Sequence, residues 1–196
     1  MILSKEQIKR LQSLDRKMAE SLKESRYRHT VAVAHTAAAL SMVHGASLYD
    51  ALTAGMLHDA AKCYSNEELL LKCRKKGIPI REIEECNPSL LHAKYGAYLA
   101  KERFGVTNEE VISAIACHTT GKPGMTLLEK IIFIADYIEP YRNHTETLPE
   151  IRKLCFLDLD QAMVRILSGM LDYLKETEAP IDEMTEKTFL YYQKRK

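Results

Sequence analysis

Hydrophobic positions recur along this chain at the spacing of amphipathic helices, and no stretch shows the sustained alternation that is typical of a β-strand. Helix start signals accompany this spacing, because a Ser or Thr repeatedly stands three residues before a Glu or Gln, as in a capping box. The pairs are Ser4 with Gln7, Ser65 with Glu68, Thr107 with Glu110 and Thr126 with Glu129. Gly45, Gly77 and Gly105 follow periodic segments and are predicted to lie at helix ends.

The pattern therefore predicts an all-α protein without a sheet. The expected helices lie near residues 4–24, 28–44, 47–61, 66–76, 89–104, 108–118, 127–139, 149–155, 158–176 and 181–194. We expect residues 1–196 to form a single-domain helical bundle, since no internal repeat and no long linker interrupts the chain. The segment from Glu139 to Pro149 has no helical period and is predicted to be an irregular loop beside the functional site.

Composition and charge exclude several classes of protein. The 196 residues are 46% hydrophobic and 28% charged, which is ordinary for a globular domain. Lys and Arg total 28 against 27 for Asp and Glu, so the net charge is +1. A general nucleic-acid-binding protein usually carries a basic excess, and we therefore expect no nucleic-acid partner.

Cysteine usage and hydropathy together predict a cytoplasmic protein. The 5 Cys are odd in number and form no CxxC pair, which favours reduced thiols over disulfides or a structural zinc site. The longest apolar runs, such as residues 131–135, are too short to span a bilayer. The N-terminal residues lack the apolar core of a signal peptide. We accordingly expect no membrane partner.

The candidate chemistry comes from polar residues placed among apolar ones. The adjacent His58 and Asp59 occur in GMLHDAAK, and Asp136 follows the apolar run IIFIA. A buried carboxylate without a partner is costly, and a metal ion would satisfy both carboxylate and imidazole. Taken alone, each residue is more often a satisfied core histidine or an ion-pair partner.

Taken together, the histidines and aspartates favour a metal site over these structural roles. His29, His92 and His118 lie on further predicted helices, separate from those that carry the His58–Asp59 pair and Asp136. A helical bundle can project such side chains from several helices into one central site. His35 and His44 are expected to be structural or exposed, and His144 lies in a polar loop.

These residues occur in an order that resembles a known family. The segments are RYRHT, LHDAAK, LLHAKYG, ACHTTG and ADYIEPYR. This ordered set resembles the HD-domain phosphohydrolases, and CHTTG and IADYIEPYR resemble the YqeK-type branch of symmetrical diadenosine tetraphosphate hydrolases. The motif-bearing resemblance covers about residues 25–145, and the resemblance implies that helices from 149–196 pack on this core.

The resemblance implies a metal site and its ligands. His29, His58, Asp59 and Asp136 would hold a divalent metal, which we expect to be iron, although imidazole and carboxylate ligands also suit manganese or zinc. The site would contain one ion or two. His92 and His118 would ligate the second ion, with Asp59 as the bridge, or would bind phosphate as imidazolium groups beside a single ion. We favour phosphate binding by His92 and His118 beside a single ion.

The resemblance also implies a substrate site around the metal. Lys62 is one helical turn from the His–Asp pair and could reach a phosphate, while Arg142 could contact phosphate oxygens through its guanidinium. The ordinary alternatives are a solvated lysine at a helix end and a surface arginine. Thr119 could donate one hydrogen bond to phosphate, and the turn at Pro180 and Ile181 is similar in place to a family loop that approaches the nucleotide. Arg26 and Lys122 are weaker candidates.

The implied reaction is the symmetrical cleavage of diadenosine tetraphosphate into two ADP by attack of a metal-bound hydroxide. Asp59 and Lys62 would be the catalytic residues, and the partner would be a dinucleoside polyphosphate. Two alternatives stay open: another HD-type nucleotide phosphohydrolase or phosphodiesterase, and a non-catalytic nucleotide-binding module. The sequence also leaves open whether the chain acts as a monomer or a homodimer.

Overall fold

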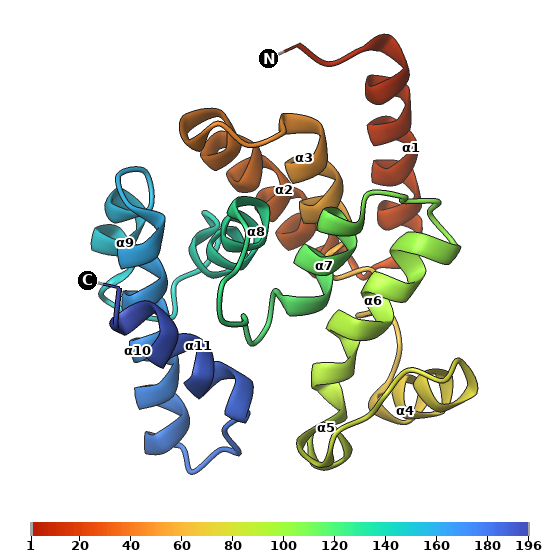
Figure 1. The fold of residues 1–196 in the computed structure, drawn as a ribbon. Helices are drawn as coiled ribbons and strands as arrows, with labels where there is room; N and C mark the ends of the chain where they lie inside the picture. The colour runs from red at the N-terminus through yellow and green to blue at the C-terminus, as the bar shows by residue number, and fades with distance from the viewer. Residues whose placement is uncertain (1, 196) are drawn as a thin grey trace.

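A computed structural model describes residues 2–195, and every regular element in this range is a helix (Figure 1). The helices are α1 (Lys5–Ser21), α2 (Glu24–His44), α3 (Leu48–Leu57), α4 (Asn66–Lys75), α5 (Glu82–Cys86), a 3-10 turn (Pro88–Leu90), α6 (Leu91–Glu102), α7 (Glu109–Cys117), α8 (Leu127–Ile138), α9 (Leu148–Leu154), α10 (Leu159–Glu176) and α11 (Glu183–Gln193). The predicted all-α class is confirmed. Within residues 2–195, no helix combines the length and the apolar character that crossing a bilayer requires.

Most helix boundaries follow the start signals in the sequence. Ser4, Ser65 and Thr126 each accept a hydrogen bond from the backbone N–H three residues later, as a capping box predicts. The prediction for Thr107 was wrong, because Asn108 caps α7 and its side chain accepts from Glu110 N at 2.9 Å. Asn is at least as good an N-cap as Thr, and it lies one residue closer to the helix.

The prediction that a helix continues through residue 61 was also wrong. α3 ends at Leu57, and the chain then tightens into turns in which Ala60 N donates to Leu57 O and Lys62 N donates to Asp59 O. The carbonyl of Gly55, in the last turn of α3, accepts a hydrogen bond from the imidazole of His58. The His58–Asp59 pair therefore lies directly after the end of a helix.

The core lies where α2, α3, α7 and α8 pack together, in the middle of the molecule in Figure 1. Val33, Leu57, Ile115 and Ile132 are fully buried there. Gly55 allows α3 to approach α2 closely, because a Cβ at this position would lie 2.6 Å from the Cα of Ala34. The helices that carry the candidate residues are thus held against one another.

The C-terminal helices pack against one side of this core. α10 contacts α8 and α9, and α11 pairs with α10 (Figure 1). The hydroxyl of Tyr192 on α11 accepts a hydrogen bond from Met125 N at 2.9 Å, just before α8. On the opposite side, α1 contacts α2 and α3.

Candidate metal centre

Four histidines and two aspartates converge inside the helical core. His29 lies within α2, His92 lies in the first turn of α6, and Asp136 lies near the end of α8. His58 directly follows α3, with Asp59 next to it, and His118 directly follows α7. Sequence segments that are far apart therefore contribute to one site, and three of its positions lie at helix ends.

Asp59 lies at the centre of this cluster, and its two oxygens face different histidines. Oδ2 lies 3.5 Å from His58 Nε2 and 3.8 Å from His29 Nε2. Oδ1 lies 3.4 Å from His92 Nε2 and 3.8 Å from His118 Nε2. The carboxylate is thus placed to bridge two adjacent groups of ligand atoms.

Asp136 completes the first of these groups. Its Oδ1 lies 3.0 Å from His29 Nε2 and 4.0 Å from His58 Nε2. Nε2 of His29 and Nε2 of His58 are buried and have no hydrogen-bond partner, although carboxylate oxygens are near. Buried polar atoms normally have partners, and ligand atoms of Asp59 also lie within 4.8 Å of those of His29 and His58. This donor set therefore fits a divalent metal ion.

Three of the imidazoles are oriented by backbone carbonyls. Nδ1 of His58, His92 and His118 lies 2.7, 2.5 and 2.7 Å, respectively, from the carbonyl oxygen three residues earlier. A carbonyl only accepts, so each Nδ1 carries the proton and each Nε2 presents a lone pair. Nε2 of His92 and Nε2 of His118 are only 3.0 Å apart. Two facing lone pairs repel each other unless a proton or a cation lies between them.

Burial and neighbouring imidazoles keep His92 and His118 uncharged. Burial, followed by the proximity of His118, lowers the pKa of His92 to about 3. Burial and the nearby His58 likewise lower the pKa of His118. At neutral pH both imidazoles are neutral, which favours cation ligation over the imidazolium contact to phosphate that we expected from the sequence.

The carboxylates are held in their charged forms. Burial alone would raise the pKa of Asp59, but His58, His92 and His118 outweigh it and lower this pKa well below the ordinary value. Burial is likewise outweighed at Asp136, whose pKa is lowered by His29, His58 and His118. Both groups are therefore anionic at neutral pH, as metal ligation requires.

Three cationic side chains border the cluster. Arg26 Nη1 lies 2.8 Å from Asp59 Oδ2, and Arg142 Nη2 donates to Asp136 Oδ1 at 2.8 Å. Lys62 is half-buried in the turn after α3, and burial lowers its pKa even though Asp59 opposes the shift. Arg26, the weaker candidate from the sequence, thus contacts the cluster directly.

A cavity of about 230 Å³ adjoins the cluster and is lined by Asp136, Arg142 and Thr119. The Thr119 hydroxyl is buried without a hydrogen-bond partner. Tyr137 and His144 line the same cavity, with ring centroids 4.6 Å apart in an edge-to-face contact. Several of the polar side chains predicted for the substrate site therefore meet in one cavity.

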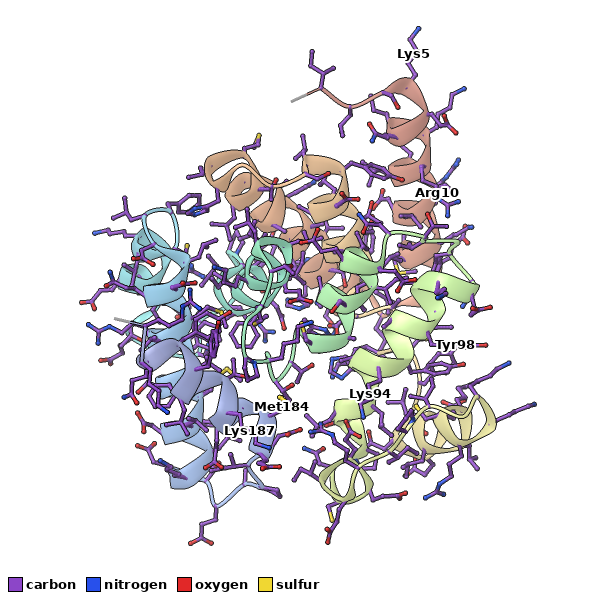
Figure 2. The ribbon with its side chains drawn as sticks, in the orientation of Figure 1. Lys5, Arg10, Lys94, Tyr98, Met184 and Lys187 are labelled. Carbon is purple, nitrogen blue, oxygen red and sulfur yellow. The ribbon has the colours of Figure 1, made fainter. Side chains whose placement is uncertain are left out.

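Thr119 also borders a second cavity, of about 290 Å³, between α6 and α11. Lys94 and Met184 line opposite sides of it (Figure 2). Arg81 contacts both carboxylate oxygens of Asp182, at 2.8 and 2.6 Å, and so ties the start of α11 to the start of α5. Pro180 and Ile181 immediately precede this ion pair, and no hydrogen bond or ion pair within residues 2–195 links their side chains to the cluster.

Other candidates lie away from the cluster. Lys122 pairs with Glu129 at 2.6 Å, so its charge is compensated locally. His44 Nε2 lies 2.7 Å from the carbonyl of Cys155 and has a structural contact. His35 is exposed.

Glu139, a buried acid that contacts the cluster, was not identified from the sequence. It is only 2% exposed, and its Oε1 lies 3.2 Å from His29 Nδ1. Its spacing of three residues from Asp136, on the same helical face, could have indicated it. The sequence pattern places Glu139 where the predicted helix 127–139 meets the predicted loop, and it gives this residue no role.

Comparison with known proteins places this architecture in a family. The family model described as HD domain matches residues 26–141 of the sequence. This range contains all four histidines and both aspartates of the cluster. The chain belongs to the HD-domain family. The expected family is thereby confirmed.

Similar HD-domain proteins share most of the chain length. A Bacillus subtilis protein named bis(5'-nucleosyl)-tetraphosphatase, symmetrical, is 40% identical over 88% of this chain and 90% of its own length. A Staphylococcus aureus protein of the same name is 32% identical over 88% of this chain and 89% of its own.

A solved structure supports the same assignment. The crystal structure of a predicted HD superfamily hydrolase involved in NAD metabolism, from Clostridium acetobutylicum, superposes with a TM-score of 0.91 at 34% identity. The match covers 94% of this HD-domain chain and 97% of the other. The C-terminal helices are therefore part of the shared architecture.

Proposed function

We propose that this HD-domain protein hydrolyses diadenosine tetraphosphate symmetrically and releases two ADP. The observation that carries the reaction class is the buried His–Asp cluster, in which two imidazole Nε2 atoms have no hydrogen-bond partner and cationic side chains border the carboxylates. The substrate assignment is supported by the relatives named symmetrical bis(5'-nucleosyl)-tetraphosphatase.

The residues of the cluster have distinct roles in this proposal. His29, His58, Asp59 and Asp136 would hold a divalent metal. A bound divalent metal supplies an activated water and polarises a phosphoryl oxygen. Asp59 Oδ1 faces the neutral imidazoles of His92 and His118, so these two would hold a second cation, with phosphate contact as the alternative.

The cations and hydroxyls beside the cluster would bind the polyphosphate. Arg26 and Arg142 lie against the two aspartates, where guanidinium groups can also contact phosphate oxygens in bidentate fashion. Lys62 would neutralise charge that develops on the phosphoryl oxygens in the transition state. The unpartnered hydroxyl of Thr119 would donate to a phosphate oxygen. The released ADP is a stable anion, so no residue is required to protonate it.

The proposal also covers the identity of the metal, the contact with the nucleoside and the location of the protein. The resident metal would be iron, since imidazole and carboxylate ligands without a thiolate suit it, although they also suit manganese and zinc. Pro180 and Ile181 would approach a nucleoside of the substrate. The cysteines are all free, which supports a cytoplasmic location.

A substrate panel tests this function against other HD-type activities. We expect diadenosine tetraphosphate to be hydrolysed with a kcat/KM at least about tenfold above that of cyclic dinucleotides and nucleoside monophosphates, a difference of roughly 1.4 kcal/mol in transition-state binding. Initial rates are measured by chromatography with the same metal-loaded preparation. A cyclic dinucleotide or monophosphate as the best substrate would replace the proposal with a phosphodiesterase or nucleotidase activity.

A further inference from the structure

Glu139 is a buried carboxylate to which the proposed reaction gives no role. Its Oε1 lies 3.2 Å from His29 Nδ1, while its Oε2 accepts a hydrogen bond from Tyr141 N at 2.7 Å. Arg142 Nε lies 3.9 Å from Oε1 and partly balances the charge. The carboxylate is thus engaged on both oxygens, and the His29 ring lies between Glu139 and Asp136.

His29 differs from the other three histidines in how it is oriented. His58 and His118 directly follow helices, where carbonyls of the last turn lack helical partners and are free to accept from Nδ1. His92 uses the carbonyl of Ser89, in the 3-10 turn before α6. His29 lies inside α2, which continues to His44, so the nearby carbonyls accept backbone N–H groups. An acceptor from outside the helix is needed, and Glu139 supplies it.

A carboxylate acceptor has two chemical consequences. An ionised carboxylate only accepts, so the proton stays on Nδ1 and the lone pair of His29 Nε2 faces Asp59 and Asp136. A charged acceptor also forms a stronger hydrogen bond than a neutral carbonyl does, and such partners behind ligating histidines commonly strengthen metal binding. Among the contacts of residues 2–195, His29 is the one cluster histidine whose Nδ1 faces a carboxylate.

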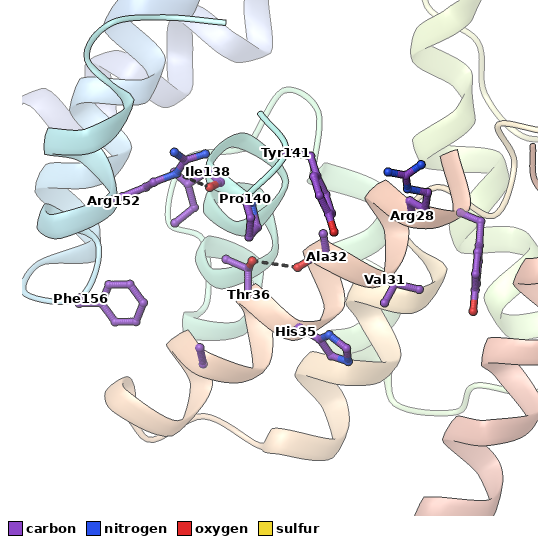
Figure 3. Close-up of a pocket in the computed structure, with 12 residues that line it drawn as sticks. Arg28, Val31, Ala32, His35, Thr36, Ile138, Pro140, Tyr141, Arg152 and Phe156 are labelled. Carbon is purple, nitrogen blue, oxygen red and sulfur yellow. Dashed lines mark hydrogen bonds between the residues drawn. The ribbon is translucent and has the colours of Figure 1, made fainter. Parts of the chain in front are cut away.

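Arg152 holds the turn that carries Glu139. From α9, its Nε donates to Ile138 O at 2.8 Å, and its Nη2 donates to Glu139 O at 2.8 Å and to Arg142 O at 2.9 Å. A pocket of about 720 Å³ lies behind this turn, with Pro140 in its lining (Figure 3). No side chain of residues 2–195 fills the space on the pocket side of the turn. The hydrogen bonds from Arg152 therefore hold the backbone of the turn in place.

We propose that Glu139 is a positioning residue of the metal centre, held in place by Arg152, and that it fixes the orientation and the tautomer of His29. The inference rests on the proposed function, in which His29 is a metal ligand. It extends the site to the end of α8 and to α9.

Zinc affinity of the purified protein tests this role without reference to turnover. The apparent Kd for zinc is measured by competition with a chromophoric chelator, for the wild type, Glu139→Ala and Glu139→Gln. We expect Glu139→Ala to bind zinc about 10–100-fold more weakly. Glu139→Gln should lie between the alanine variant and the wild type, because its amide oxygen still accepts from Nδ1 but carries no charge. Arg152→Met should also weaken binding, because it releases the turn.

The control is Glu146→Gln, an exposed acid in the same loop, which should bind zinc as the wild type does. Histidine N–H resonances of the zinc-loaded protein give a second measure. The His29 Nδ1 proton should be retained in the wild type and Glu139→Gln and should exchange rapidly in Glu139→Ala. Equal zinc affinity in folded Glu139→Ala, Glu139→Gln and wild type would overturn this inference alone. A wild type that binds no zinc would overturn the proposed metal centre as well.

Discussion

Asp136→Ala is expected to lose both its bound metal and its hydrolytic activity. Asp136 Oδ1 lies 3.0 Å from His29 Nε2, in the group of ligand atoms that also includes His58. Removing a ligand carboxylate should weaken metal binding by more than the roughly 10–100-fold that is typical when a hydrogen-bond partner of a ligand is removed. Elemental analysis after desalting, together with the kcat for diadenosine tetraphosphate, measures both effects. His58→Ala should behave in the same way.

The matched control for this experiment is Asp172→Ala, which removes an exposed acid from α10. This variant should keep its metal and its turnover, and circular dichroism should show that all the variants are folded. Full metal occupancy in Asp136→Ala would rule out the proposed ligand set.

Lys62→Ala is expected to keep its metal and to lose about 10²–10³-fold in kcat, the effect that is typical when one preorganised donor to a developing charge is removed. Lys62 lies in the same turn as Asp59, and its backbone N–H donates to Asp59 O at 2.9 Å. The side chain can thus reach a phosphate beside the metal without being a ligand. Steady-state kinetics and metal analysis of the same preparation measure the two properties separately.

Lys75→Ala, at an exposed position near the end of α4, is the control for loss of a lysine charge. It should leave kcat unchanged. If Lys62→Ala has wild-type kinetics, Lys62 is an ordinary lysine at a helix end.

Local signals in the sequence predicted most of the helices. Periodicity and capping residues mark long amphipathic segments well, as at Ser65 and Thr126. The prediction failed where such signals are weak or absent. α5 has only 5 residues, EIEEC, which is too few to show a period. α2 begins four residues before the predicted start, since Lys23 at its N-cap makes no side-chain hydrogen bond that would mark the boundary.

The candidate metal cluster was predictable because its members are conspicuous in their surroundings. An acid such as Asp136 after five apolar residues requires a partner, and the family resemblance indicated which histidines could join it. The two-sided position of Asp59 depends on how α3, α6 and α7 pack, and no local pattern encodes that. The spacing of Glu139 from Asp136 marks it as a neighbour of the site, but its contact with His29, 110 residues away in sequence, depends on the packing of the helices.

Hydrolysis of diadenosine tetraphosphate in oxygen-18 water tests the central claim most directly. Chromatography and mass spectrometry of the initial products identify which phosphorus is attacked. Attack at the second phosphorus from one adenosine predicts two ADP per turnover, one with a single oxygen-18 atom and one unlabelled. AMP and ATP in equal amounts as the initial products would contradict symmetrical cleavage.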